Sequence, residues 1–317
     1  MRGAAIAGAV VAALAALLYL ARPPAMPRGV GDALPQTLEG DIHALTGAPP
    51  TLAVLPFEVM GSRPGQGYLA HGLGAELTAG LSRLSGLTVV GPSPIGTGAR
   101  DERPPFAAAR YRLWGETARA DGRIGLHLLL IETASGEQSW SRRFDRPFEH
   151  LIDLVGEAAL ALAGALAIEV SAAEHRHLSR RCTHSAEAFD LFLRAQSNLL
   201  KREAPENLHA RELYREALSI DPDFARALGG IALTHAADYR NQWTPDPAAS
   251  LARAGEAALA AARLDPDLPE VLWVQAYVHA REGDHESALA LLDRALALDP
   301  SFADAYALKG GVLTYLG

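Results

Sequence analysis

The sequence has one cysteine, two lysines and no recognisable catalytic motif, and each shortage narrows what the chain can do. The single Cys182 excludes an intrachain disulfide. Only Lys201 and Lys309 are lysines among the 29 basic residues, a bias that we attribute to genome composition. No GxSxG, HExxH, GxxxxGK[ST] or paired-cysteine pattern occurs. The glycines Gly91, Gly96 and Gly98 do not have the spacing of a phosphate loop. The sequence therefore predicts no enzymatic activity, no cofactor, no metal and no small-molecule substrate.

The negative charge is concentrated in the last part of the chain. Residues 185–317 hold 20 acidic and 12 basic side chains, whereas residues 1–184 hold 17 of each. Nucleic-acid binding derives most of its affinity from clustered lysine and arginine, which this distribution lacks. We therefore expect no nucleic-acid partner.

An uncharged segment occupies the amino terminus. Nineteen residues from Gly3 to Ala21 carry no charge and lie between Arg2 and Arg22. As a helix they would cover about 28 Å, close to the hydrocarbon thickness of a bilayer. We predict a transmembrane helix or signal anchor over residues 1–22 and a proline-rich and glycine-rich linker over residues 23–50. A cleaved signal peptide is the alternative.

The next 120 or so residues have the length of one small domain and the pattern of an α/β fold. Leucines recur every three or four positions from Tyr68 to Leu84, which predicts an amphipathic helix that covers a sheet. Asp121-Gly122 and Ser135-Gly136 separate apolar runs and predict an antiparallel meander. We expect a small α/β domain with a mixed sheet over residues 51–170 and a connector over residues 171–184. Strands are predicted at 51–57, 87–90, 111–116, 124–133 and 138–144, and a long helix at 151–170.

Several short motifs in this region occur in an order that resembles a known family. They are Leu55-Pro56-Phe57, Tyr68-Leu69-Ala70-His71-Gly72-Leu73, Glu76-Leu77, Leu81-Ser82-Arg83, Gly86-Leu87 and the run from Trp140 to Arg146. Together they resemble the TolB-like domain. That family implies a domain between a membrane helix and tetratricopeptide repeats, in the carboxy-terminal half of bacterial adenylate cyclase-like or winged-helix signalling proteins. The sequence departs from it at His71, where the family usually has aspartate, and in residues 91–106.

Three similar phrases mark an internal repeat. Asp221-Pro222, Asp265-Pro266 and Asp299-Pro300 close them, separated by 44 and then 34 residues. A period of 34 is typical of tetratricopeptide repeats, each a helical hairpin. We therefore predict an all-α tetratricopeptide repeat solenoid of about three and a half units over residues 185–317, with an insertion around residues 239–249. We expect the first helix of the last unit to bury Tyr306, Leu308, Val312 and Leu313. Its partner helix is missing from the sequence, so we expect either that the chain is a fragment or that this end docks on another protein.

The best candidate for a protein-binding groove is Trp273, Tyr277 and Arg281. Their spacing of four places them on one side of a helix, and aromatic residues and arginine often anchor interfaces. An equally good interpretation is that both aromatic rings pack against neighbouring helices. His175, His177, Cys182 and His184 are residue types that bind metals. On a helix, however, His175 and His177 would point in nearly opposite directions and could not share a metal ion, so we interpret this run as a polar connector.

These patterns predict a non-catalytic, membrane-anchored scaffold or sensor arm that binds a protein or peptide partner through its repeats. The resemblance implies a single-pass protein of the bacterial inner membrane with most of the chain in the periplasm. One alternative is the regulatory half of an adenylate cyclase-like or transcriptional signalling protein whose output domain lies upstream. Another is a cleaved, soluble periplasmic protein.

Overall fold

The computed structural model describes residues 49–60, 65–91, 108–300 and 302–316. The predicted membrane helix, the predicted linker up to residue 48 and most of residues 91–106 lie outside this part of the chain. Within the described residues, no helix combines the length and the apolar character needed to cross a bilayer. Every element below belongs to one compact unit, Pro49–Gly317.

A mixed sheet forms the first layer of this unit, as the sequence predicted. The strand order is β3-β1-β4-β5-β6, with β2 paired beside β4. Strand β1 runs parallel to β3 and β4, whereas β4, β5 and β6 form the predicted antiparallel meander. Strand β4 extends past the predicted end at residue 116 because Thr117–Ala120 also pair with β5. The strands are β1 (Thr51–Val54), β2 (Glu58–Val59), β3 (Thr88–Val90), β4 (Tyr111–Ala120), β5 (Arg123–Glu132) and β6 (Gln138–Pro147).

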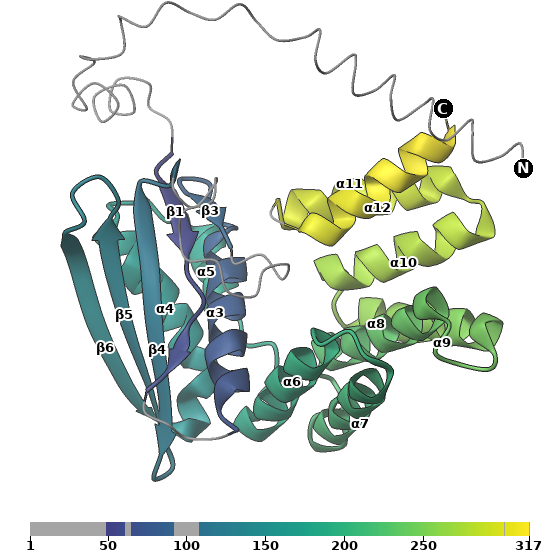
Figure 1. Ribbon diagram of the computed structural model, residues 1–317, viewed down its shortest axis with the longest axis horizontal. Coiled ribbons are helices and arrows are strands. Elements are labelled where there is room, and N and C mark those ends of the chain that lie inside the picture. The colour runs from purple at the N-terminus through teal and green to yellow at the C-terminus, as the bar shows by residue number, and fades with distance from the viewer. Residues whose placement is uncertain (1–48, 61–64, 92–107, 301, 317) are drawn as a thin grey trace, which may run out of the picture. The chain divides into compact units, whose positions relative to one another are not determined.

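Two helices, α3 (Gly67–Leu81) and α4 (Leu151–Ala165), pack on the sheet (Figure 1). The predicted leucine stripe of α3 is buried in the core, which also takes alternate residues of β4 and β5. A short helical turn, η2 (Phe148–His150), precedes α4. Helix α4 ends before the predicted residue 170, because Ala167 adopts a left-handed φ of 53° that a helix cannot continue through.

Helical hairpins follow a short connector helix, α5 (Ala172–Leu178). Helices α6, α8 and α10 each pack along the next helix in the chain, α7, α9 and α11 respectively. Asp299 follows the last residue of α11, as the repeat pattern predicted, and Gly283 ends α10 with a left-handed φ of 86°. Within the predicted insertion, α8 ends at Asn241, because Gln242 adopts a left-handed φ of 56°, and α9 begins at Pro247. The helices are α6 (Ala186–Leu199), α7 (Ala204–Ile220), α8 (Ala225–Asn241), α9 (Pro247–Leu264), α10 (Pro269–Glu282), α11 (His285–Leu298) and α12 (Ala303–Leu316).

One hydrophobic core joins the sheet layer to the first hairpin. The same buried cluster contains Leu77 of α3, Phe192 of α6 and Tyr214 of α7. Helices α3 and α6 approach closely at Gly72, where an added Cβ would lie 2.9 Å from Leu193. The α/β elements and the first repeat are therefore packed together rather than joined only by a connector.

The expected buried side of α12 is only partly correct. Val312 is buried at 4% exposure, but Tyr306 and Leu313 are 55% and 48% exposed. Ala305 is fully buried instead. The apolar positions were visible in the sequence pattern, but α12 buries only the side that packs on α10 and α11.

A substitution at Gly115 of β4 tests how tightly this core is packed, because a Cβ there would lie 2.5 Å from the ring of Phe57. We expect Gly115→Ala to lower the free energy of unfolding by about 1–3 kcal/mol through overpacking. Urea unfolding of residues 49–317 measures the change. Gly125→Ala on β5 is the matched control, since its nearest contact would be an ordinary 3.7 Å. Equal effects of the two substitutions would contradict the packing described.

Candidate functional site

The predicted groove residues lie together on α10, but two of them are buried. Trp273 and Tyr277 are 7% and 6% exposed, and their rings stack with centroids 5.4 Å apart. The indole Nε1 of Trp273 donates a hydrogen bond to the backbone oxygen of Asp304 on α12, at 3.0 Å. Tyr277 meets the ring of Tyr239 on α8 edge to face, at 6.1 Å. The two rings thus connect three successive repeats.

Arg281 is the exposed member of the predicted set. Its guanidinium lies 5.3 Å from the centroid of the Tyr277 ring. Among the described residues it has no acidic group within ion-pair distance. The burial of Trp273 and Tyr277 favours a packing role for the rings and leaves Arg281 available at the surface. A role for the three residues in binding a partner stays a prediction.

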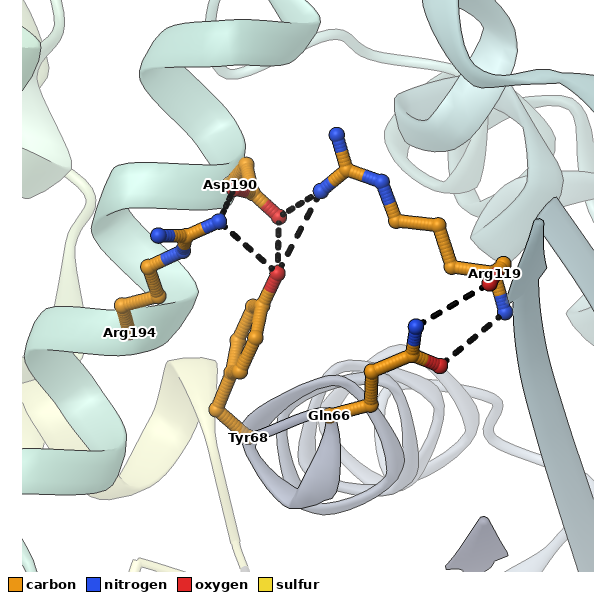
Figure 2. Close-up of polar contacts among 5 residues, drawn as sticks. All are labelled: Gln66, Tyr68, Arg119, Asp190 and Arg194. Carbon is orange, nitrogen blue, oxygen red and sulfur yellow. Dashed lines mark hydrogen bonds and ion pairs between the residues drawn. The ribbon is translucent and has the colours of Figure 1, made fainter. Parts of the chain in front are cut away.

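A polar cluster that the sequence did not predict joins α3 to α6 (Figure 2). The hydroxyl of Tyr68 donates to Asp190 Oδ1 at 2.7 Å. Arg119 of β4 reaches the same oxygen at 3.0 Å, and Arg194 pairs with Asp190 Oδ2 at 2.8 Å. Gln66 exchanges two hydrogen bonds with the backbone of Arg119. Burial, and then the neighbouring Asp190 carboxylate, raise the pKa of Tyr68, so this hydroxyl stays a donor.

A second polar cluster joins α3 to α8. Both terminal nitrogens of Arg226 donate to the carboxylate of Glu76, each at 2.7 Å, and Arg226 Nε lies 3.5 Å from Glu270 of α10. The side chains of Arg226 and Glu76 are only 19% and 12% exposed. Burial alone would lower the pKa of Arg226, but Glu76 outweighs it and holds that pKa well above its usual value. A two-pronged pair of this kind fixes both distance and orientation.

The hydrogen bonds and ion pairs of these clusters join α3 to α6 and to α8. The described residues contain no group of three or more histidine, cysteine or acidic side chains placed to hold a metal ion. Cys182 lies beside Arg226, with Sγ 3.9 Å from a guanidinium nitrogen, and burial raises the pKa of its thiol. His175 and His177 lie on α5. A raised thiol pKa disfavours the nucleophilic thiolate.

Sequence reasoning missed both clusters for a definite reason. Tyr68 and Glu76 are part of the motifs that carry the family resemblance, so their presence was visible. Their partners, Asp190 and Arg226, lie 122 and 150 residues away in the chain. A single sequence contains no signal that links positions so far apart.

His235 of α8 is a buried titratable group within the repeats, at 6% exposure. Its Nδ1 has no hydrogen-bond partner among the described residues. Burial, followed by the nearby cations Arg211, Arg215 and Arg253, lowers its pKa to about 4, although Asp238 acts in the opposite direction. The imidazole is therefore neutral in the folded protein at neutral pH.

Comparison with known proteins agrees with the helical half of this architecture. The sequence pattern of the family described as tetratricopeptide repeat matches residues 269–311, which contain α10, α11 and the first part of α12. The chain therefore contains a tetratricopeptide repeat. It is also 31% identical over 208 residues to a protein of Rhizobium meliloti (strain 1021) with the provisional name adenylate cyclase 3. This similarity covers 63% of the chain and 35% of that relative, so the chain spans about a third of the relative's length.

Two solved structures are each similar to part of the chain. A thermophilic tetratricopeptide repeat protein of Thermus thermophilus is 17% identical and covers 54% of this chain and 75% of its own, with a TM-score of 0.35. TolB from Acinetobacter baumannii is 16% identical and covers 37% of this chain and 28% of its own, with a TM-score of 0.29. TM-scores this low do not establish a shared fold, so the TolB-like assignment stays a prediction.

The Glu76–Arg226 pair is open to a double-mutant cycle. Glu76→Gln or Arg226→Met alone leaves the partner group poorly solvated, which we expect to cost about 3–5 kcal/mol in the free energy of unfolding. The double variant should lose clearly less than the sum of the two. The exposed pair Arg123–Asp145 is the control, and Asp145→Asn should cost no more than about 1 kcal/mol. Additive losses at Glu76 and Arg226 would show that the pair does not couple α3 to α8.

The lowered pKa of His235 predicts a pH dependence of stability. The unfolded chain takes up a proton near the usual pKa of 6.5, but the folded chain takes it up only near pH 4. The contribution of His235 is therefore present above about pH 6.5 and is lost as the pH falls toward 4. Urea unfolding at several pH values should show a smaller acid loss for His235→Leu. An acid loss in His235→Leu equal to that of the wild type would contradict this prediction.

Proposed function

We propose that this protein is a non-catalytic scaffold or sensor arm that binds a protein or peptide partner through its tetratricopeptide repeats. The observation that carries the proposal is the matched repeat at residues 269–311, which contains the helical hairpin of α10 and α11. Stacked helical hairpins form extended binding surfaces in other repeat proteins. The two polar clusters orient α3 relative to α6 and α8.

The proposal includes membrane attachment through residues 1–22 and a mainly periplasmic position in the bacterial inner membrane. The support is the uncharged run from Gly3 to Ala21, which has the length of one span. The TolB-like resemblance supports the same orientation. Fractionation of cells, with mass spectrometry of the mature amino terminus, separates an anchored chain from a cleaved one.

Arg281 provides the sharpest test of partner binding, because it is exposed and changing it leaves the buried rings in place. We expect Arg281→Glu to reduce recovery of the partners retained by the wild type by at least tenfold in a quantitative pull-down, since the charge at the proposed surface is reversed. Arg263→Glu, an exposed arginine at the end of α9, is the matched control and should recover wild-type amounts. Equal recovery by both variants would remove Arg281 from the binding surface.

A second candidate function is favoured by one observation. The similarity over 208 residues to a protein named as an adenylate cyclase fits a regulatory region of a cyclase-like or transcriptional signalling protein. In that case the repeats and the α/β elements would serve an output domain encoded upstream. The DNA sequence before Met1 decides between the two: an in-frame cyclase or winged-helix domain supports the regulatory role.

A further inference from the structure

Two adjoining cavities lie between the α/β layer and the turns of the repeats. Their volumes are about 520 and 550 Å³, within the range of small-molecule sites. Arg83, His177, Leu178 and Leu298 line both of them, so the cavities share one boundary. Arg83 lies just after α3, His177 and Leu178 belong to α5, and Leu298 is the last residue of α11. We call the two cavities together the Arg83 cleft.

Arg83 is an arginine of the cleft walls that pairs with no carboxylate of the described residues. Its Nη1 is 3.5 Å from His177 Nδ1, a long hydrogen bond, and its Nε is buried without a partner. The other arginines of the walls are each in an ion pair, namely Arg180 with Asp265, Arg181 with Asp153 and Arg226 with Glu76. A guanidinium N–H buried without an acceptor costs free energy, and an anion in the cleft would supply that acceptor.

The acidic side chains around the cleft limit the charge of that anion. Burial lowers the pKa of Arg83, whereas Glu270, Asp299 and Glu76 act in the opposite direction. These carboxylates are close enough to influence Arg83, and they would repel a second negative charge on a ligand. A carboxylate carries one charge, and its two oxygens can accept parallel hydrogen bonds from a guanidinium. The charges therefore favour a carboxylate over a doubly charged phosphate.

The larger cavity provides an apolar wall beside the same guanidinium. Its apolar residues include Leu84, Leu87, Val89, Leu178 and Leu298. Leu298 is half-buried and belongs to neither of the two hydrophobic clusters of the described residues. Glu174 is the acidic residue of this wall, but its two oxygens already accept hydrogen bonds from the backbone of Ser85 and Ser171. An apolar group would be dehydrated here while a charge at its end reached Arg83.

We propose that the Arg83 cleft binds a small amphiphilic carboxylic acid, whose carboxylate pairs with Arg83 and whose apolar body lies along Leu298. The inference rests on the proposed function as a sensor arm and names the class of ligand that is sensed. The walls come from β3, α5 and the end of α3 on one side and from the end of α11 on the other. One bound molecule therefore contacts both the α/β layer and the repeats, and it stabilises the folded state in which they meet.

The first experiment titrates octanoate into the compact unit of residues 49–317, which contains both hydrophobic clusters, in an isothermal titration calorimeter. We expect saturable binding of one octanoate per chain. Octanol and octyltrimethylammonium have the same apolar chain without the negative charge and should bind at least tenfold more weakly. Acetate has the charge without the apolar chain and should show no saturable binding. If octanoate does not bind, the cleft is filled by the protein itself or by water, and the proposal is overturned.

Substitutions in the walls locate the bound octanoate. Arg83→Gln should weaken its binding at least tenfold, to the level of octanol, and Leu298→Gln should weaken it several-fold. Arg176→Gln, at an exposed arginine of α5 outside both walls, is the control for the charge. Leu291→Gln, at another half-buried leucine of α11 outside both walls, is the control for the apolar contact. Thermal unfolding followed by circular dichroism identifies any variant that does not fold. If folded Arg83→Gln and Arg176→Gln bind octanoate equally, the site is not at Arg83.

The outcome is distinguishable from failure of the proposed function. Arg281→Glu should bind octanoate as the wild type does, because Arg281 does not line the cleft. Octanoate binding together with full partner recovery by Arg281→Glu would keep the cleft and reject the partner surface at Arg281. Reduced partner recovery by Arg281→Glu in a protein that does not bind octanoate would overturn the cleft and keep the proposed function.

Discussion

The close packing of α3 against α6 is the contact on which the described architecture depends. Gly72 lets the two helices approach until Leu193 fills the space that a side chain would occupy. Polar clusters lie on both sides of this contact, around Asp190 and around Arg226. Apolar packing stabilises the contact, whereas the two-pronged and shared hydrogen bonds fix its orientation because they weaken steeply with misalignment. One helix of the α/β layer is therefore held by two successive repeats.

The repeats differ in how much of their surface contacts the α/β layer. The polar side chains of α6 and α8 that meet α3 are already engaged, and they are mostly buried. Helices α10, α11 and α12 make fewer contacts with the sheet layer than α6 does. Arg281 of α10 lies in this later part and is exposed. The repeats nearest the sheet thus pack against the α/β layer, while those farther along the chain contain the surface that we propose for a partner.

The candidate groove shows how far residue spacing can be taken. A spacing of four correctly placed Trp273, Tyr277 and Arg281 on one side of a helix, next to one another. Spacing did not reveal that Tyr239 and the backbone of Asp304 would cover the two rings, because those contacts come from the preceding and following repeats. The same limit applies to α12, where the apolar positions were visible but the side that other helices cover was not.

The sequence by itself determined the local architecture, because hydrophobic period, turn residues and repeat spacing act over a few to a few dozen residues. It thereby predicted the mixed sheet, its meander and the helical hairpins. Only the tertiary structure decided that the α/β layer and the first repeat share one core, and that Tyr68 and Glu76 orient it. The hydrogen bonds from Tyr68 to Asp190 and from Arg226 to Glu76 join residues more than 100 positions apart. Such pairs form because the folded elements have complementary shape and charge, and no local sequence pattern indicates them.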